Sequence, residues 1–155
     1  MLLEIGKKAP EFSLVAGDGK TYALGDFRGK NLIVYFYPKD LTPGCTIEAQ
    51  QFQVALPQLK KLNTAVVGVS KDTPALHQKF AAECALQFPL LSDPDGSMIA
   101  AYGAWQEKSM YGKKYMGIAR ITYLLGPDGA VLKYYSKVTP KTHAGEVLAD
   151  LETRD

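Results

Sequence analysis

Leu32-Ile-Val-Tyr-Phe-Tyr37 is the strongest indication of fold class in this sequence, because it is a short, unbroken apolar run rich in residues that favour β-strands. Thr64–Ser70 is a second run of this kind, and both runs indicate strands that are buried on both faces. Between them, apolar residues recur at helical spacing, which predicts a helix over about 46–62 with a bend at Pro57. A strand, a helix and a strand in this order predict parallel pairing through a right-handed crossover.

The rest of the chain adds short elements around this unit. A second helix is expected over 74–85, with Asp72 or Thr73 as its cap, followed by a short strand over 88–91. Turn-rich segments predict antiparallel hairpins from strands 12–15 and 21–24 and from strands 118–125 and 130–135. A helix of about two turns should follow Gly96, and a last helix should span 142–151. The predicted fold class is α/β, a mixed central β-sheet flanked by helices on both faces.

Length and composition limit the possible functions. The 155 residues fit a single domain, 1–155, that is long enough to fold without a disulfide framework. Eighteen basic and sixteen acidic residues give a net charge of +2, which argues against nucleic acid or an acidic membrane surface as a partner. The longest apolar run is far too short to span a membrane, and the N-terminal stretch does not resemble a signal peptide. We therefore expect a cytoplasmic protein.

Two cysteines and two histidines are the obvious candidates for chemistry. Cys45 and Cys84 lie 39 positions apart, which excludes both a Cys-x-x-Cys redox motif and a zinc-binding array. Neither His77 nor His143 stands at metal-ligand spacing from a cysteine. If the cysteines have a chemical role, they should act as thiols.

Cys45 stands in the more informative setting, at the end of the loop that follows the first buried strand. In open α/β sheets, sites tend to form beyond the carboxyl ends of the strands. Cys45 falls at the start of the predicted helix, where unpaired N–H groups and the helix dipole favour thiolate over thiol. Thr42, three residues earlier, can place a hydroxyl beside the sulfur. A cysteine buried as a small apolar residue is the alternative, but a polar loop rich in proline and glycine is an unusual place for one.

Four segments in the same order resemble the peroxiredoxins, and in particular the subfamily called peroxiredoxin Q or bacterioferritin comigratory protein. The loop Phe36-Tyr-Pro-Lys-Asp-x-Thr42-Pro-Gly-Cys-Thr46 resembles its active-site signature. The other three are Gly6-Lys-Lys-Ala-Pro-Glu-Phe12, Phe88-Pro-Leu-Leu-Ser-Asp-Pro-Asp-Gly96 and Trp105-Gln-Glu-Lys-Ser-Met-Tyr-Gly-Lys-Lys-Tyr-Met-Gly-Ile-Ala-Arg120.

The resemblance implies a thioredoxin-like fold and an enzyme that reduces hydrogen peroxide and organic hydroperoxides without metal or flavin. It implies that Cys45 is the peroxidatic cysteine, which becomes a sulfenic acid. Thr42 matches the residue that contacts thiolate and peroxide, Pro38 the residue that shields the pocket, and Arg120 the arginine that stabilises the thiolate. Thioredoxin or another thiol would be the reductant, and the resemblance favours a monomer.

Arg120 is also unusual by itself, because it lies within the otherwise apolar predicted strand 118–125. A charge in such a strand must reach a surface or meet a partner. A surface arginine at a sheet edge would satisfy this requirement, and so would a guanidinium that pairs with a thiolate.

Cys84 allows two interpretations. Many members of the subfamily carry a resolving cysteine five residues after the first, but that position is Gln50 here. Others carry it on the next helix, near Ala81 when counted from Phe88, and Cys84 lies one helical turn later on the same face. Cys84 also continues an apolar stripe with Leu76 and Phe80, which favours a packing role. Either Cys84 forms a disulfide with Cys45, or an external thiol reduces the sulfenic acid directly.

Other features are interpreted more simply. The pairs Glu107-Lys108 and Lys113-Lys114 indicate a solvated loop, and the tyrosines of the C-terminal half indicate packing.

A redox sensor or binding protein that is switched by oxidation of Cys45 is the alternative to an enzyme. Rapid repeated turnover with a thiol would distinguish the two.

Overall fold

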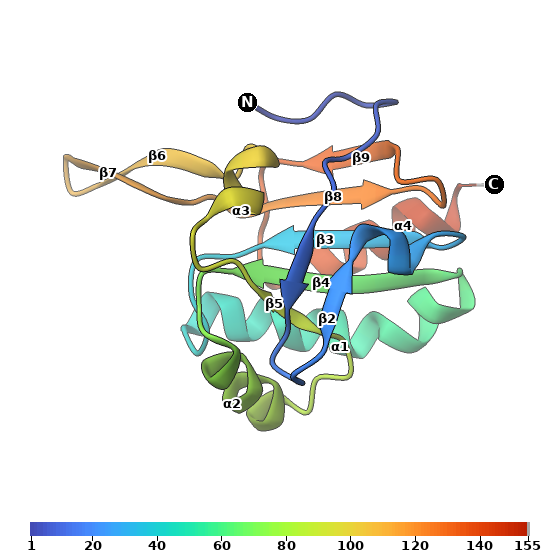
Figure 1. Ribbon diagram of the computed structural model, residues 1–155, viewed down its shortest axis with the longest axis horizontal. Coiled ribbons are helices and arrows are strands. Elements are labelled where there is room, and N and C mark those ends of the chain that lie inside the picture. The colour runs from blue at the N-terminus through green and yellow to red at the C-terminus, as the bar shows by residue number, and fades with distance from the viewer. Residues whose placement is uncertain (155) are drawn as a thin grey trace.

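The computed structural model describes residues 1–154, which form a five-stranded mixed sheet with helices on both faces (Figure 1). The strand order is β5-β4-β3-β8-β9. These strands are Leu90–Ser92, Thr64–Ser70, Asn31–Phe36, Ile121–Leu125 and Val131–Tyr135. The helices α1, α2, α3 and α4 span Pro43–Lys61, Pro74–Cys84, Ser97–Ala101 and His143–Glu152. The predicted α/β class and the mixed, helix-flanked sheet are therefore confirmed.

The apolar run that begins at Leu32 forms β3, the central strand of the sheet. β3 pairs in parallel with β4 and antiparallel with β8, and its residues 32–36 are fully buried. Alternate side chains of β3 enter two different cores, because successive residues of a strand point to opposite faces. Ile33 and Tyr35 pack with α1, α2 and α4, whereas Val34 and Phe36 pack with α3 and the N-terminal segment. The continuous apolar run thus reflects burial on both faces, as predicted.

The expected parallel crossover is present, but its helix begins earlier than the sequence indicated. α1 begins at Pro43 rather than near residue 46, because proline suits the first helical position, where no N–H partner is needed. Pro57 lies inside α1 as expected. For α2 the cap is Thr73, whose hydroxyl accepts a hydrogen bond from the Leu76 N–H at 3.2 Å.

Two hairpins flank the sheet, and one of them was missed. The N-terminal hairpin of β1, Ser13–Val15, and β2, Thr21–Ala23, is present as predicted, with a 3-10 turn, η1, at Leu24–Phe27. The segment that the sequence indicated as a solvated loop is instead a second hairpin. Its strands are β6, Trp105–Met110, and β7, Lys113–Ile118, and it extends away from the body of the molecule (Figure 1).

The prediction of one strand over 118–125 is also wrong in part. Strand structure is interrupted between Ile118, the end of β7, and Ile121, the start of β8. Arg120 therefore lies in the link between two strands and not within one. Within residues 1–154, no helix has the length and apolar character required to cross a membrane.

Candidate active site

Cys45 lies in the first turn of α1, just beyond the carboxyl end of the central strand β3. Its side chain is only 1% exposed, and it packs in the core that β3 shares with α1. Thr42 is the residue that precedes the helix, and Pro43 and Gly44 are its first two residues. A sulfur at this position is close to the unpaired N–H groups and the positive end of the helix dipole, both of which favour thiolate.

Arg120 is the direct partner of the Cys45 sulfur. Its Nη2 donates a hydrogen bond to Sγ at 3.3 Å, and its Nη1 donates to Oε1 of Glu48 at 2.9 Å. The planar guanidinium presents two parallel donors, so one side chain serves both acceptors at a fixed angle. The break between β7 and β8 frees Arg120 from the strand ladder and lets it reach α1. The alternative of a surface arginine at a sheet edge is therefore wrong.

Glu48 is a part of this arrangement that the sequence analysis missed. It lies three residues after Cys45 on the same face of α1, and its carboxyl group is fully buried. Burial raises its pKa to about 7, although the charge and hydrogen bond of Arg120 act in the opposite direction. Oε2 has no hydrogen-bond partner among residues 1–154. The i, i+3 spacing from a candidate thiolate, with a polar residue on a buried helix face, was the signal that could have identified it.

Gly44 permits the close approach of Arg120. A Cβ atom at position 44 would lie 2.8 Å from Nη2 of Arg120, well inside ordinary contact distance. The sequence alone indicates Gly44 only as part of a polar loop rich in proline and glycine. In the structure, the missing side chain leaves space for the guanidinium that contacts the sulfur.

Thr42 and Pro38 lie in the loop between β3 and α1, on the same approach to the helix. The Thr42 hydroxyl donates to the carbonyl oxygen of Lys39 at 2.8 Å and does not cap the helix. The backbone carbonyl of Thr42 accepts the Thr46 N–H at 2.9 Å. Pro38 is half-buried directly after Tyr37. The loop thus places both residues next to the helix start that carries Cys45, with the Thr42 hydroxyl held by its own loop.

Cys84 is the last residue of α2, and its side chain is partly buried at the margin of the core that contains Cys45. Both cysteines are free thiols. Burial raises the pKa of Cys84, and the negative charge of Glu83 adds to this effect, so the thiol form is favoured. Ala85, which follows it, has a left-handed backbone with φ of 51° that ends the helix. Cys84 therefore combines core contact with a position at a helix terminus.

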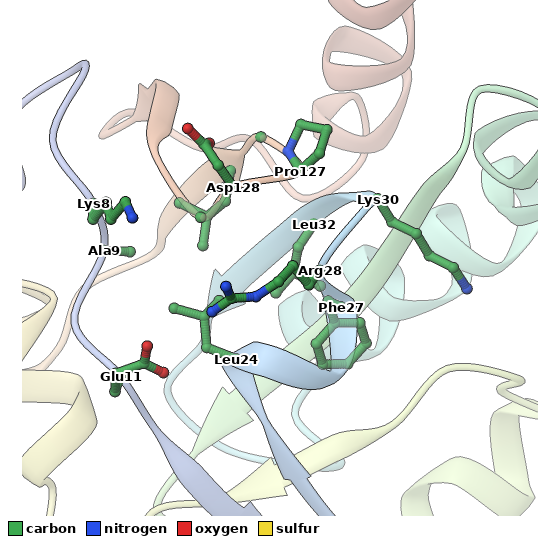
Figure 2. Close-up of a pocket in the computed structure, with 13 residues that line it drawn as sticks. Lys8, Ala9, Glu11, Leu24, Phe27, Arg28, Lys30, Leu32, Pro127 and Asp128 are labelled. Atoms are coloured by element: carbon green, nitrogen blue, oxygen red, sulfur yellow. The ribbon is translucent and has the colours of Figure 1, made fainter.

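A separate small pocket lies at the other end of the sheet (Figure 2). It has a volume of about 60 Å³, and its walls come from the N-terminal segment, η1 and the turn after β8. Lys8, Glu11, Arg28 and Asp128 contribute charges of both signs (Figure 2). None of its lining residues belongs to the group around Cys45, so we do not assign it to the active site.

Comparison with known proteins identifies the family of the chain. The AhpC/TSA family matches residues 5–134. A putative peroxiredoxin Bcp of Coxiella burnetii is 43% identical over 151 residues, which cover 97% of this chain and all of that protein.

Solved structures with a similar fold are also peroxiredoxins of this kind. A mutant of Xylella fastidiosa PrxQ superposes with a TM-score of 0.93 at 35% identity, covering 98% of this chain and 97% of that one. The bacterioferritin comigratory protein of Xanthomonas campestris, solved to study its alkyl peroxide reduction activity, gives a TM-score of 0.86 at 40% identity. That match covers 91% of this chain and 90% of the other. The expected thioredoxin-like fold is confirmed by these neighbours.

Proposed function

The chain belongs to the AhpC/TSA family, as a thiol peroxidase of its Bcp and peroxiredoxin Q branch, and from this premise we propose that Cys45 is the peroxidatic cysteine. The observation that carries the proposal is the hydrogen bond of 3.3 Å from Arg120 Nη2 to Cys45 Sγ in the first turn of α1. A guanidinium keeps its positive charge at any working pH and therefore stabilises a thiolate throughout. Thiolate is the nucleophilic form of cysteine.

The first step is a displacement on the peroxide. The Cys45 thiolate attacks one peroxide oxygen, an S–O bond forms, and the O–O bond breaks. The other oxygen leaves with a proton as water or an alcohol, so that sulfur is oxidised to a sulfenic acid while the peroxide is reduced. The Arg120 guanidinium offers donors to the charge that moves from sulfur to oxygen. The Thr42 hydroxyl, whose own hydrogen is donated to the Lys39 carbonyl oxygen, offers an acceptor for the O–H of the peroxide. Pro38 lines the approach and limits the entry of water.

The substrates we propose are hydrogen peroxide and organic hydroperoxides. The Xanthomonas relative, solved to study alkyl peroxide reduction, supports the second class. Cys45 itself is almost fully buried, so a slender –O–OH group can approach its sulfur more easily than a bulky electrophile can.

We propose that Cys84 resolves the sulfenic acid. The Cys84 sulfur would lose its proton and attack the Cys45 sulfur. An S–S bond forms, the S–O bond of the sulfenic acid breaks, and the hydroxyl group leaves with that proton as water. An external dithiol such as thioredoxin would then reduce the disulfide in a monomeric enzyme. A disulfide requires Cα atoms within about 7 Å, so the first turn of α1 would have to unwind. The position of Cys84 at the last residue of α2, next to the left-handed Ala85, supports the proposal from the other side, because little of α2 has to unwind for Cys84 to move.

The packing of Cys84 against the core supports the competing one-cysteine cycle, in which an external thiol reduces Cys45 directly. Steady-state peroxide consumption with a thioredoxin system tests both. The Cys45→Ser variant should lose all activity, and retained activity would refute the assignment of Cys45. The Cys84→Ser variant should lose turnover with thioredoxin but keep one rapid oxidation. Unchanged turnover in that variant would refute the resolving role and support the one-cysteine cycle.

A further inference from the structure

A buried polar network ties the loop before α1 to helix α2. Asp40 in the loop and His77 in α2 are 2% and 0% exposed, and Oδ2 of Asp40 lies 2.6 Å from Nδ1 of His77. The other carboxylate oxygen, Oδ1, accepts the Tyr37 hydroxyl at 2.5 Å. Nothing in the chemistry around Cys45 requires this network, although Asp40 is only five residues before the cysteine.

The backbone of Asp40 is anchored as well as its side chain. Its N–H donates to Oδ2 of Asp72 at 2.8 Å, and the Ser70 hydroxyl donates to the same oxygen at 2.7 Å. The ligand atoms of Asp40, Asp72 and His77 lie within 4.8 Å of one another, as they would around a cation. Each carboxylate already accepts hydrogen bonds from protein donors, however, so the arrangement is a hydrogen-bond network.

The proton positions in the Asp40–His77 pair follow from its acceptors. Nε2 of His77 lies 3.0 Å from the carbonyl oxygen of Leu91, which can only accept, so Nε2 carries a hydrogen. One further proton must lie between Nδ1 and the carboxylate, because two acceptors would repel each other at 2.6 Å. The pair is therefore neutral as a whole. Removal of either partner would take the short hydrogen bond from a buried polar group, and loss of Asp40 would leave Nδ1 of His77 only a contact of 3.4 Å with the Tyr37 hydroxyl.

Asp40 holds a turn that the backbone does not favour by itself. Leu41 has a left-handed φ of 65°, a conformation that residues with a side chain rarely adopt. On the other side of Asp40, the carbonyl oxygen of Lys39 accepts the Thr42 hydroxyl at 2.8 Å. Asp40, between Lys39 and Leu41, is thus fixed by its side chain and by its N–H. It lies two residues before Thr42, the residue that precedes α1.

We propose that the Asp40–His77 pair is a positioning device that orients the Thr42 side chain for reaction with peroxide. The proposal rests on the peroxidase function. It makes Asp40 and His77 positioning residues, because neither contacts the sulfur. The Asp40–His77 pair acts through its hydrogen bonds and not through a net charge, because the pair is neutral as a whole.

The Asp40→Asn and Asp40→Ala variants test this directly. Asparagine can accept the Tyr37 hydroxyl through its oxygen and donate to a neutral His77 through its amide, so every group keeps a partner. Alanine removes the acceptor that joins both groups and leaves the Tyr37 hydroxyl and Nδ1 of His77 only their longer mutual contact of 3.4 Å. The rate constant for reaction of Cys45 with hydrogen peroxide and the rate constant for its alkylation by iodoacetamide are measured for each variant and for the wild type. Circular dichroism and thermal unfolding monitor the fold.

We expect Asp40→Ala to slow the peroxide reaction by about tenfold or more, because small misplacements at a reacting centre have effects of that size. Alkylation needs the thiolate but not the orientation of Thr42, so it should change by less than about threefold. Asp40→Asn should keep the peroxide rate constant within about threefold of the wild type. If Asp40→Ala does not fold, Tyr37→Phe removes a single donor from the same carboxylate and should slow only the peroxide reaction.

Three results would overturn the proposal: an unchanged peroxide rate constant in Asp40→Ala, or in Tyr37→Phe where that variant replaces it; equal losses in both reactions; or a loss in Asp40→Asn as large as in Asp40→Ala. A wild-type protein that reacts slowly with peroxide would instead refute the peroxidase function, so the two failures are distinguishable.

Discussion

Gly44→Ala should separate the activity of this protein from its stability. The added Cβ would lie 2.8 Å from Nη2 of Arg120, the atom that donates to the Cys45 sulfur. The clash involves the far end of a flexible side chain, so the guanidinium can move and the backbone need not. The expected consequence is a displaced Arg120 above an otherwise intact helix α1.

The size of the effect follows from the hydrogen bond that is lost. A hydrogen bond to a charged group contributes about 1.5–3 kcal/mol, which corresponds to a loss of about 10- to 150-fold in the rate constant with peroxide. Stability should change little, because alanine is favoured over glycine in helices by up to about 1 kcal/mol, which offsets part of the repacking. We expect the free energy of unfolding to stay within about 1 kcal/mol of the wild type.

The assay is the rate constant for single-turnover oxidation by hydrogen peroxide, measured together with urea unfolding. Gly145→Ala is the matched control, because Gly145 also lies in the first turn of a helix, α4, and a Cβ there would meet nothing within 4 Å. It should leave the rate constant unchanged. A Gly44→Ala protein that reacts as fast as the wild type would refute the role assigned to the Arg120–Cys45 contact.

Three further changes have defined outcomes. Glu48→Gln should remove a pH dependence of stability. The folded wild type holds the Glu48 proton up to pH about 7 and the unfolded chain releases it near 4.5, so its free energy of unfolding should fall relative to the variant across that window by roughly 3 kcal/mol. Urea unfolding of both proteins at pH 4.5 and 7 measures this, and an equal difference in free energy of unfolding between wild type and variant at the two pH values would contradict it. Arg120→Lys replaces a two-donor fork by one point charge, so the peroxide rate constant should fall by about tenfold or more, and a wild-type rate would refute the need for both contacts. Thr73→Ala removes the cap of α2 and should lower the free energy of unfolding by about 1 kcal/mol without changing the peroxide rate constant; no loss of stability would show that the cap contributes nothing.

The central sheet was predictable because β3 and β4 are buried on both faces and therefore consist almost entirely of apolar residues. Their apolar runs have no polar face, which only strands covered on both sides require. The hairpin β6–β7 left no such pattern, because its residues are mostly exposed and its stability comes from pairing between its own strands. Its two-residue turn places Tyr111 and Gly112 at φ of 53° and 77°. Glycine is common in turns of this kind, but tyrosine gives no turn signal.

The site divides in the same way. Cys45, Thr42 and Arg120 were identifiable from a loop motif and from a charge in an apolar segment. Glu48 and Gly44 were not, because their importance lies in the distance to a guanidinium that arrives from 72 and 76 residues away along the chain. The spacing of residues within α1 cannot predict which side chain from a distant part of the sequence packs against that helix.

The most direct test of the central claim is the intact mass of the protein after one equivalent of hydrogen peroxide, with alkylation of the remaining thiols. We expect Cys45 to be consumed at once. The wild type should lose two hydrogens with both thiols blocked, and the Cys84→Ser variant should gain one oxygen on Cys45. A protein whose Cys45 remains a free thiol after this treatment would contradict the account.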